Sequence, residues 1–157
     1  MFKSTQIFQA NRVELAVAVA ELLVRRGPAD KIEIARELAR VGRSEYDHRQ
    51  GLYYGDLAVA LGLAERWRAS SVTFSATIRG EELVRLPSQV ERSAHLRASA
   101  LANPVIHALV AYLERQPRPR TQDMVAIFLA THSSLSRPTV ERRASSYFRV
   151  LRDLHII

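Results

Sequence analysis

The chain of 157 residues has room for one ordinary domain or two small ones, and its apolar share of 47% is enough to build a core. A charged share of 25% with only 6 glycines and 6 prolines argues against disorder, and no apolar run reaches the roughly 18 residues that predict a membrane span. Cysteine is absent, which excludes disulfides and thiolate metal sites and fits a cytoplasmic protein.

The positive charge is concentrated in the last two-fifths of the sequence. Residues 1–91 hold 13 basic and 12 acidic side chains, whereas residues 92–157 hold 10 arginines and 4 acidic side chains. Of the 23 basic residues, 21 are arginines, whose planar guanidinium groups match phosphates and guanine edges. This distribution favours a polyanionic partner for the C-terminal part of the chain.

Three helices are predicted in the first two-fifths of the chain, after 11 polar and mixed residues that are typical of an extended arm or a short first strand. Apolar periodicity and flanking glycines place these helices at residues 12–26, 31–41 and 44–61. Asp30 and Ser44 are the expected N-caps of the second and third helices. Gly51 and Gly55 inside the third helix predict a close helix contact or a bend.

A β-hairpin is expected after the third helix, because residues 63–67 and 72–78 alternate apolar with polar side chains around a polar turn. Two motifs, Leu61-Gly62-Leu63 and Thr77-Ile78-Arg79-Gly80, flank this hairpin. They resemble the "LGL … LTxxG" frame of many bacterial winged-helix domains, although Ala76 stands where the frame has Leu. The resemblance implies that Thr-x-x-Gly closes the wing and opens the next helix.

The same order of helices begins again at Pro104. Two helices are expected at residues 104–116 and 121–132, and a third runs from Ser136 to Ile157. One buried stripe is predicted on the third helix, formed by Val140, Ala144, Tyr147, Leu151 and Leu154.

The two third helices align at an offset of 93 residues (142 minus 49), which favours a structural repeat over a chance match. Arg49–Tyr54 aligns with Arg142–Tyr147, and Leu61-Gly62-Leu63 aligns with Leu154-His155-Ile156. The first copy continues from this point into its hairpin, whereas the second ends at Ile157. We therefore expect a fragment of a longer protein, with a natural wingless helix-turn-helix that ends in a β-strand as the alternative.

The predicted fold is mainly α with a short β-hairpin wing, arranged as two tandem winged-helix or helix-turn-helix units. Unit 1 takes residues 1–87, with its wing at about 63–79, and residues 88–103 form a linker helix. Unit 2 takes residues 104–157, with its wing truncated or absent.

Twelve side chains are predicted to contact DNA, because arginine can bind guanine edges while serine and threonine reach phosphates or bases. Unit 2 supplies those at the start and on the polar face of its third helix: Ser136, Arg137, Thr139, Arg142 and Arg143. The equivalent residues of unit 1, among which Glu45 and Asp47 would repel phosphate, are Ser44, His48, Arg49 and Gln50. Arg68 at the wing tip and Arg118 and Arg120 beside prolines are expected to bind the phosphate backbone. The alternative for all of these arginines is a solvated surface.

The aromatic residues are expected in the core rather than stacked on bases: Tyr46, Tyr53, Trp67, Tyr147 and Phe148. No pattern of catalytic or cofactor-binding residues is found. The five histidines have no metal-ligand spacing, and nucleotide-binding glycine motifs and a GxSxG elbow are absent. We therefore expect no cofactor, no metal and no catalysis in this chain.

Two winged-helix units, the second with Ser136, Thr139, Arg142 and Arg143 as Ser-x-x-Thr-x-x-Arg-Arg, resemble the DNA-recognition regions of some bacterial type II restriction endonucleases and related defence proteins. In those proteins tandem winged-helix modules precede a nuclease domain. The resemblance covers residues 12–157 and implies recognition of double-stranded DNA here, with cleavage residues in a C-terminal nuclease or other effector domain.

The predicted function is sequence-specific binding of double-stranded DNA through the major groove, with no membrane partner. The alternative is a complete dimeric transcription regulator that resembles MarR-type repressors. There, residues 12–80 would read DNA and the helices after Gly80 would join two subunits. A winged helix that binds RNA or another protein is a third possibility.

Overall fold

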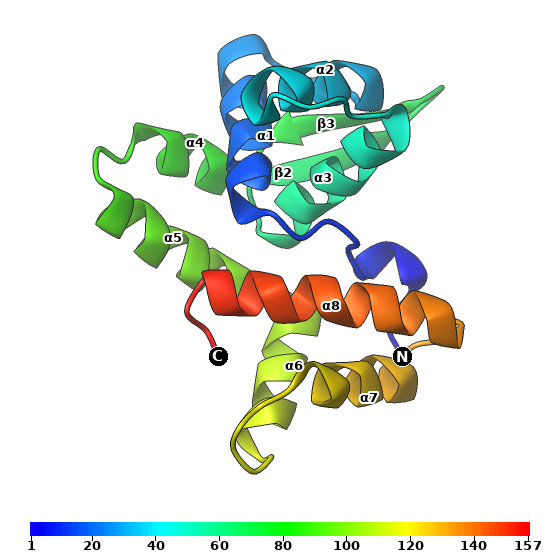
Figure 1. The fold of residues 1–157 in the computed structure, drawn as a ribbon. Coiled ribbons are helices and arrows are strands. Elements are labelled where there is room, and N and C mark those ends of the chain that lie inside the picture. Colours follow the sequence, from blue (N-terminus) through cyan, green and yellow to red (C-terminus); the bar gives the residue numbers. More distant parts are fainter.

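The computed structural model describes residues 1–157 and is mainly helical, with one small sheet (Figure 1). The upper part in Figure 1 consists of α1 (Val13–Arg26), β1 (Ala29–Asp30), α2 (Lys31–Gly42), α3 (His48–Ala60), β2 (Ala64–Arg68) and β3 (Val72–Ala76). The remaining helices are α4 (Ile78–Arg85), α5 (Gln89–Leu101), α6 (Pro104–Glu114), α7 (Gln122–His132) and α8 (Arg137–Asp153). The prediction of a mainly helical fold with a short hairpin is confirmed.

The three strands form one antiparallel sheet in the order β1-β3-β2. Phe74 of β3 pairs with Ala29 on one side and with Arg66 on the other. Its ring is buried against α3 at Gly55, where any side chain would collide with it. The sequence pattern does not predict β1, because two residues are too few to show an alternation.

Gly51 marks the close helix contact that the sequence predicts. A methyl group at this position of α3 would collide with the backbone carbonyl of Lys31, at the start of α2. Asp30 caps α2 as expected, since its carboxylate accepts hydrogen bonds from the N–H groups of Ile32 and Glu33.

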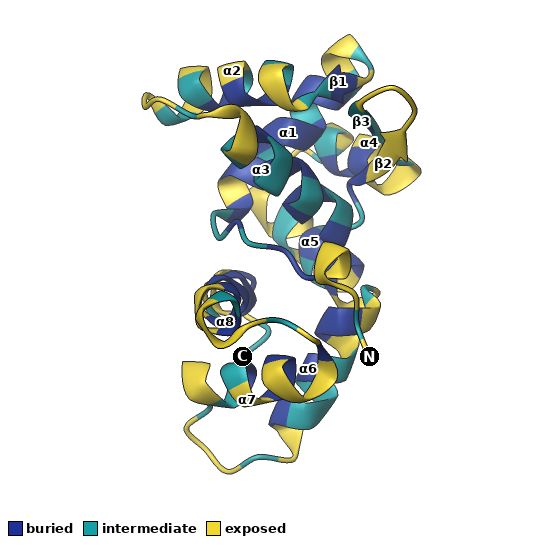
Figure 2. Ribbon diagram, turned by 90° about the vertical axis from the view of Figure 1, so that its right-hand side faces the viewer, coloured by how far each residue is buried: buried dark blue, intermediate teal, exposed yellow.

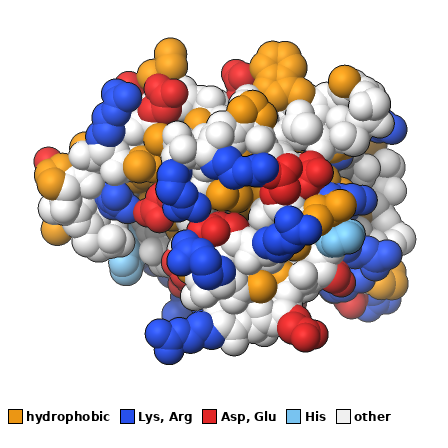
Figure 3. Space-filling model, turned by 90° about the horizontal axis from the view of Figure 1, so that it is seen from above, with side chains coloured by type: hydrophobic (Ala, Val, Ile, Leu, Met, Phe, Trp, Pro, Cys, Tyr) orange, Lys and Arg blue, Asp and Glu red, His pale blue; other side chains and the backbone are white.

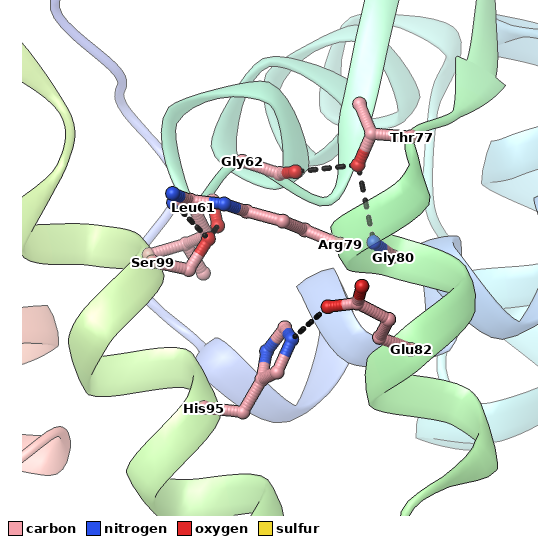
Figure 4. A network of polar contacts seen from close by, with 8 residues as sticks. All are labelled: Leu61, Gly62, Thr77, Arg79, Gly80, Glu82, His95 and Ser99. Atoms are coloured by element: carbon pink, nitrogen blue, oxygen red, sulfur yellow. Dashed lines mark hydrogen bonds and ion pairs between the residues drawn. The ribbon is translucent and has the colours of Figure 1, made fainter.

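The motif residues around the hairpin join the end of α3 to the start of α4 (Figure 4). The Thr77 hydroxyl donates to the carbonyl of Gly62 at 2.5 Å and accepts from the N–H of Gly80 at 3.1 Å. Gly62 has a φ of 75°, and a side chain at Gly80 would collide with the carbonyl of Leu63. Thr77 thus opens α4 at Ile78, as the winged-helix frame implies.

Helix α5, predicted as a linker, binds the C-terminal ends of both α3 and α8. The Ser99 hydroxyl donates to the carbonyl of Leu61 at 2.6 Å (Figure 4), and the Arg97 guanidinium donates to the carbonyl of Leu154 at 3.4 Å. Both helices are therefore fastened at their last turn to one element.

The two helices also end with the same backbone geometry. Gly62 and His155, equivalent at the offset of 93, both have a positive φ, 75° and 55°. Beyond them, Leu63 N–H donates to the carbonyl of Ala58, as Ile156 N–H does to that of Leu151. This is the six-to-one hydrogen bond of a Schellman motif, so the two helix ends share one local geometry.

The N-terminal segment, residues 1–11, lies between α3 and α8 and contains a short 3-10 helix, η1 (Ser4–Gln6). Phe2 N–H donates to the carbonyl of His132 at 2.7 Å. Phe8 is buried and stacks on Tyr147 of α8, with ring centroids 3.8 Å apart. The predicted arm is therefore packed into the fold.

Two expectations are wrong. The third helix of unit 1 begins at His48 instead of Ser44, because Asp47 accepts a hydrogen bond from Gln50 N–H while the Gln50 side chain binds back to Asp47 N–H. Trp67 is 56% exposed on the hairpin, outside the core, and its ring N–H donates to the Ser75 hydroxyl.

The buried stripe on α8 is confirmed at all five positions: Val140, Ala144, Tyr147, Leu151 and Leu154.

Candidate nucleic-acid interface

Most of the predicted contact residues lie on one edge of the molecule. Because α3 and α8 both end at α5, both begin on the opposite side, at the right of Figure 1, where the tip of the β2–β3 hairpin also lies. We call this side the helix-start edge and define it by His48, Arg49, Gln50, Arg68, Ser136, Arg137, Thr139 and Arg142. Of the other four predicted residues, Ser44 lies in the loop before α3, and Arg118, Arg120 and Arg143 lie elsewhere.

Helix α8 presents an open face at this edge. Figure 2 looks onto the edge and shows α8 almost end-on, with a buried side and an exposed side. The Arg137 side chain is 90% exposed and pairs with Glu141 at 3.1 Å. Arg142 is exposed and has no acidic partner; its guanidinium lies 3.4 Å from the Thr139 hydroxyl. Arg142 is therefore the cation of this face that is free to bind an external anion.

Arg143 is not available for DNA. Its side chain is buried, and its guanidinium donates to the carbonyls of Ser4 and Ile7 at 2.6 and 2.7 Å. Burial lowers the pKa of the Arg143 guanidinium, and the nearby Tyr147 opposes that shift. The sequence pattern predicts an exposed residue, because Arg143 lies at the margin of the apolar stripe of α8. The N-terminal segment covers this margin and buries the side chain.

The start of α3 offers a smaller polar surface. His48 and Arg49 are exposed at its first turn, whereas the Gln50 amide is used to cap the helix. Asp47 stands directly before them and accepts the capping hydrogen bond. Glu45 and Asp47 therefore offset the charge of Arg49 at this end of α3, whereas at the start of α8 the Glu141 carboxylate pairs with Arg137 and leaves Arg142 free.

The N-terminal segment shields the middle of α3. A hollow of about 190 Å³ is lined by the segment, by Tyr53 and Asp56 of α3, and by Arg143 of α8. Asp56 pairs with Arg66 of β2 at 2.8 Å. Burial raises the pKa of Asp56, although Arg66 lowers it. A shielded face that carries a carboxylate is poorly suited to approach phosphates.

The hairpin tip adds Arg68 and an aromatic residue. Arg68 is exposed and forms no ion pair, whereas Arg66 is engaged by Asp56. Trp67 lies between them with its side chain in solvent. Its position in an alternating strand predicts a core residue. In the structure, only the first residue of β2 is buried, and the rest of the strand, with Trp67, extends beyond the core.

Arg118 and Arg120 lie in the loop between α6 and α7, at the C-terminal end of α8 and away from the helix-start edge. Arg120 donates through Nε to the carbonyl of Leu113 at 2.9 Å. With Arg152 of α8, they line a separate hollow. Arg152 is a functional candidate that sequence reasoning missed, because it is adjacent to this loop only in three dimensions.

The arginine excess of residues 92–157 is only partly a surface charge. Four of these arginines donate to backbone carbonyls within the molecule: Arg92, Arg97, Arg120 and Arg143. Arg137 and Arg149 pair with acidic neighbours one turn away on α8. The cations left without acidic or carbonyl partners are Arg115, Arg118, Arg142 and Arg152.

The face over α1 and α2 carries charges of both signs. Figure 3 views the molecule from above and shows basic and acidic side chains interleaved. Arg26 pairs with Glu33, and Glu37 pairs with both Arg25 and Arg40. This face therefore lacks the uncompensated positive charge of a phosphate-binding surface.

The structure contains no cluster of three or more histidine or acidic side chains that could hold a metal ion. No single helix is both long and apolar enough to cross a membrane; α5 and α6 meet that threshold only together, and they are bent by 90°.

These features define a helix-rich protein with a three-stranded antiparallel sheet and arginines at the starts of two long helices. The chain belongs to the family described as domain of unknown function (DUF7226), which matches residues 16–151. No curated protein and no solved structure matches it.

Proposed function

We propose that this chain binds double-stranded DNA through the helix-start edge. In this proposal residues 12–80 form a winged helix and α6, α7 and α8 form a second, wingless helix-turn-helix unit. The element order of helix, strand, helix, helix and hairpin supports the first assignment, and the turn of four residues between α7 and α8 supports the second.

The observation that carries the proposal is the common position of two helix starts and a hairpin tip. The first turn of a helix has unpaired N–H groups and a partial positive charge, which favour phosphate. At this edge, Arg49, Arg68 and Arg142 are exposed and form no ion pair. One elongated polyanion can therefore contact all three elements at once.

Helix α8 is the main DNA-contacting element in this proposal. Its exposed side carries Arg142, with the Thr139 hydroxyl one turn earlier and the Ser136 hydroxyl 3.0 Å from that of Thr139. Arginine can bind guanine O6 and N7 in the major groove, and the hydroxyls can donate to phosphates. In contrast, α3 contributes mainly through its first turn, since its middle is shielded, so unit 1 acts largely as a support that places Arg68 and Arg49.

The test is Arg142→Ala, compared with Arg85→Ala as the matched control. Arg85 is exposed on α4, has no ion pair and lies away from the helix-start edge. Fluorescence anisotropy with a labelled duplex at several salt concentrations measures affinity and its salt dependence. We expect Arg142→Ala to weaken binding and to reduce the salt slope by about one, and Arg85→Ala to change neither. Equal effects of the two variants would exclude the proposed contact.

The dimeric-regulator alternative makes a different prediction for the molecular mass in solution. After Gly80, the apolar residues Leu83, Leu96, Leu109 and Leu113 are buried within the single chain. This packing favours a monomer, whereas a stable dimer through residues 81–157 would support the alternative. Competition among duplex DNA, single strands and RNA tests the third possibility.

A further inference from the structure

The C-terminal end of α8 borders a hollow of about 580 Å³ that lies apart from the helix-start edge. We call it the arginine hollow; its lining residues are Arg118, Pro119, Arg120, Phe148, Arg152 and Ile157. Arg142 and Arg152 are ten residues apart on α8, which corresponds to about 15 Å along the helix axis. The hollow is therefore separate from the surface that is proposed to contact duplex DNA.

Three arginines line the arginine hollow, and no carboxylate is among the lining residues. None of Arg118, Arg120 and Arg152 forms an ion pair. The hydrogen bond from Arg120 Nε to the carbonyl of Leu113 holds that side chain in place and leaves its terminal N–H groups for another acceptor. Three cations without a carboxylate around one hollow favour a ligand with more than one negative charge, such as a phosphate monoester at neutral pH.

The other wall of the hollow is apolar. Phe148 and Pro119 form part of it, and the Arg152 guanidinium lies over the Phe148 ring, 5.7 Å from its centroid. Arginine guanidinium groups and aromatic rings can both stack on a nucleobase. A bare phosphate would also leave most of this volume empty, since small-molecule sites typically begin near 300 Å³.

We infer that the arginine hollow binds the phosphate monoester of a nucleotide, with the phosphate among Arg118, Arg120 and Arg152 and the base against Phe148 and Pro119. This chemistry occurs in a free mononucleotide and in the 5′-phosphorylated end of a nucleic-acid strand. The site goes beyond the proposed duplex contact, since it requires a terminal phosphate and does not use Arg142.

The experiment is isothermal titration calorimetry of the full chain with adenosine 5′-monophosphate, adenosine and inorganic phosphate. We expect the nucleotide to bind at least about tenfold more tightly than either of its parts, because only the nucleotide uses both walls. Arg118→Gln and Arg152→Gln should each weaken nucleotide binding by about tenfold. Arg115→Gln is the matched control, since Arg115 is exposed nearby but does not line the hollow.

Nucleotide binding no tighter than that of inorganic phosphate, or equal losses in Arg115→Gln and Arg152→Gln, would overturn the inference. Arg142→Ala separates the two proposals: it should weaken duplex binding and leave nucleotide binding unchanged. The source of the phosphate follows from comparing 5′-phosphorylated with 5′-hydroxyl oligonucleotides. A gain from the phosphate that is lost in Arg152→Gln identifies a strand end, and no gain identifies a free nucleotide.

Discussion

Helices α3 and α8 end in the same way but differ along their outer faces. Both finish in a Schellman motif and bind α5 through a last-turn carbonyl. The middle of α3 faces the N-terminal segment and carries Asp56, whereas α8 has an open face with Arg142. The comparison teaches that a shared helix order fixes the position of a helix, and that the segment packed against it decides which face is free to bind.

Gly51 in α3 and Ala144 in α8 occupy equivalent positions at the offset of 93 residues (144 minus 51). Substitutions there should show the largest difference in the loss of stability. Gly51→Ala should destabilise the protein by about 3 kcal/mol, because its methyl group collides with the backbone of α2 at Lys31. Ala144→Gly, its counterpart in the other unit, should cost about 1 kcal/mol through lower helix propensity. Urea denaturation of the two variants measures both free energies of unfolding.

The glycine substitution also tests how far the two units are alike. If Gly51→Ala were no more destabilising than Ala144→Gly, then α2 would not approach α3 as closely as described. That outcome would remove the expected difference between Gly51 and Ala144.

The sequence predicts those features that depend only on residues close together in the chain. The apolar stripe of α8, the Asp30 cap and the close approach at Gly51 all follow from spacing and residue type within one or two turns. The burial of Arg143 and the exposure of Trp67 do not follow from local spacing. Arg143 is buried by a segment more than 130 residues away in the sequence, and Trp67 is exposed because its hairpin extends beyond the core. The arginine hollow escapes prediction for the same reason, since α8 and the loop after α6 supply its walls.

The next prediction concerns the adjacent residues Arg142 and Arg143, which the sequence treats as equivalent. Arg143→Met should destabilise the protein by about 2 kcal/mol, because the buried carbonyl of Ile7 and the partly buried carbonyl of Ser4 lose their donor. Arg142→Met should change stability by no more than about 0.5 kcal/mol, since Arg142 is exposed. Thermal unfolding monitored by circular dichroism compares the pair.

Arg143→Met also tests the packing of the N-terminal segment. Amide hydrogen exchange of residues 2–9 should become faster in this variant and remain unchanged in Arg142→Met. Slow exchange retained after loss of the guanidinium would contradict the view that Arg143 fastens the segment, and the shielding of α3 would then need another cause.

The smallest expected losses of stability concern the two contacts through which α5 binds the ends of α3 and α8. Ser99→Ala should cost about 1 kcal/mol, because its hydroxyl is buried and donates to the Leu61 carbonyl at 2.6 Å. Arg97→Ala should cost less than about 0.5 kcal/mol, since its 3.4 Å contact with the Leu154 carbonyl is long and partly solvated. Because both losses arise in native contacts to the same helix, α5, a double variant tests whether the contacts are independent. Additive losses would mean that the two ends are held separately, whereas a double loss well below the sum would mean that α5 couples the position of α3 to that of α8.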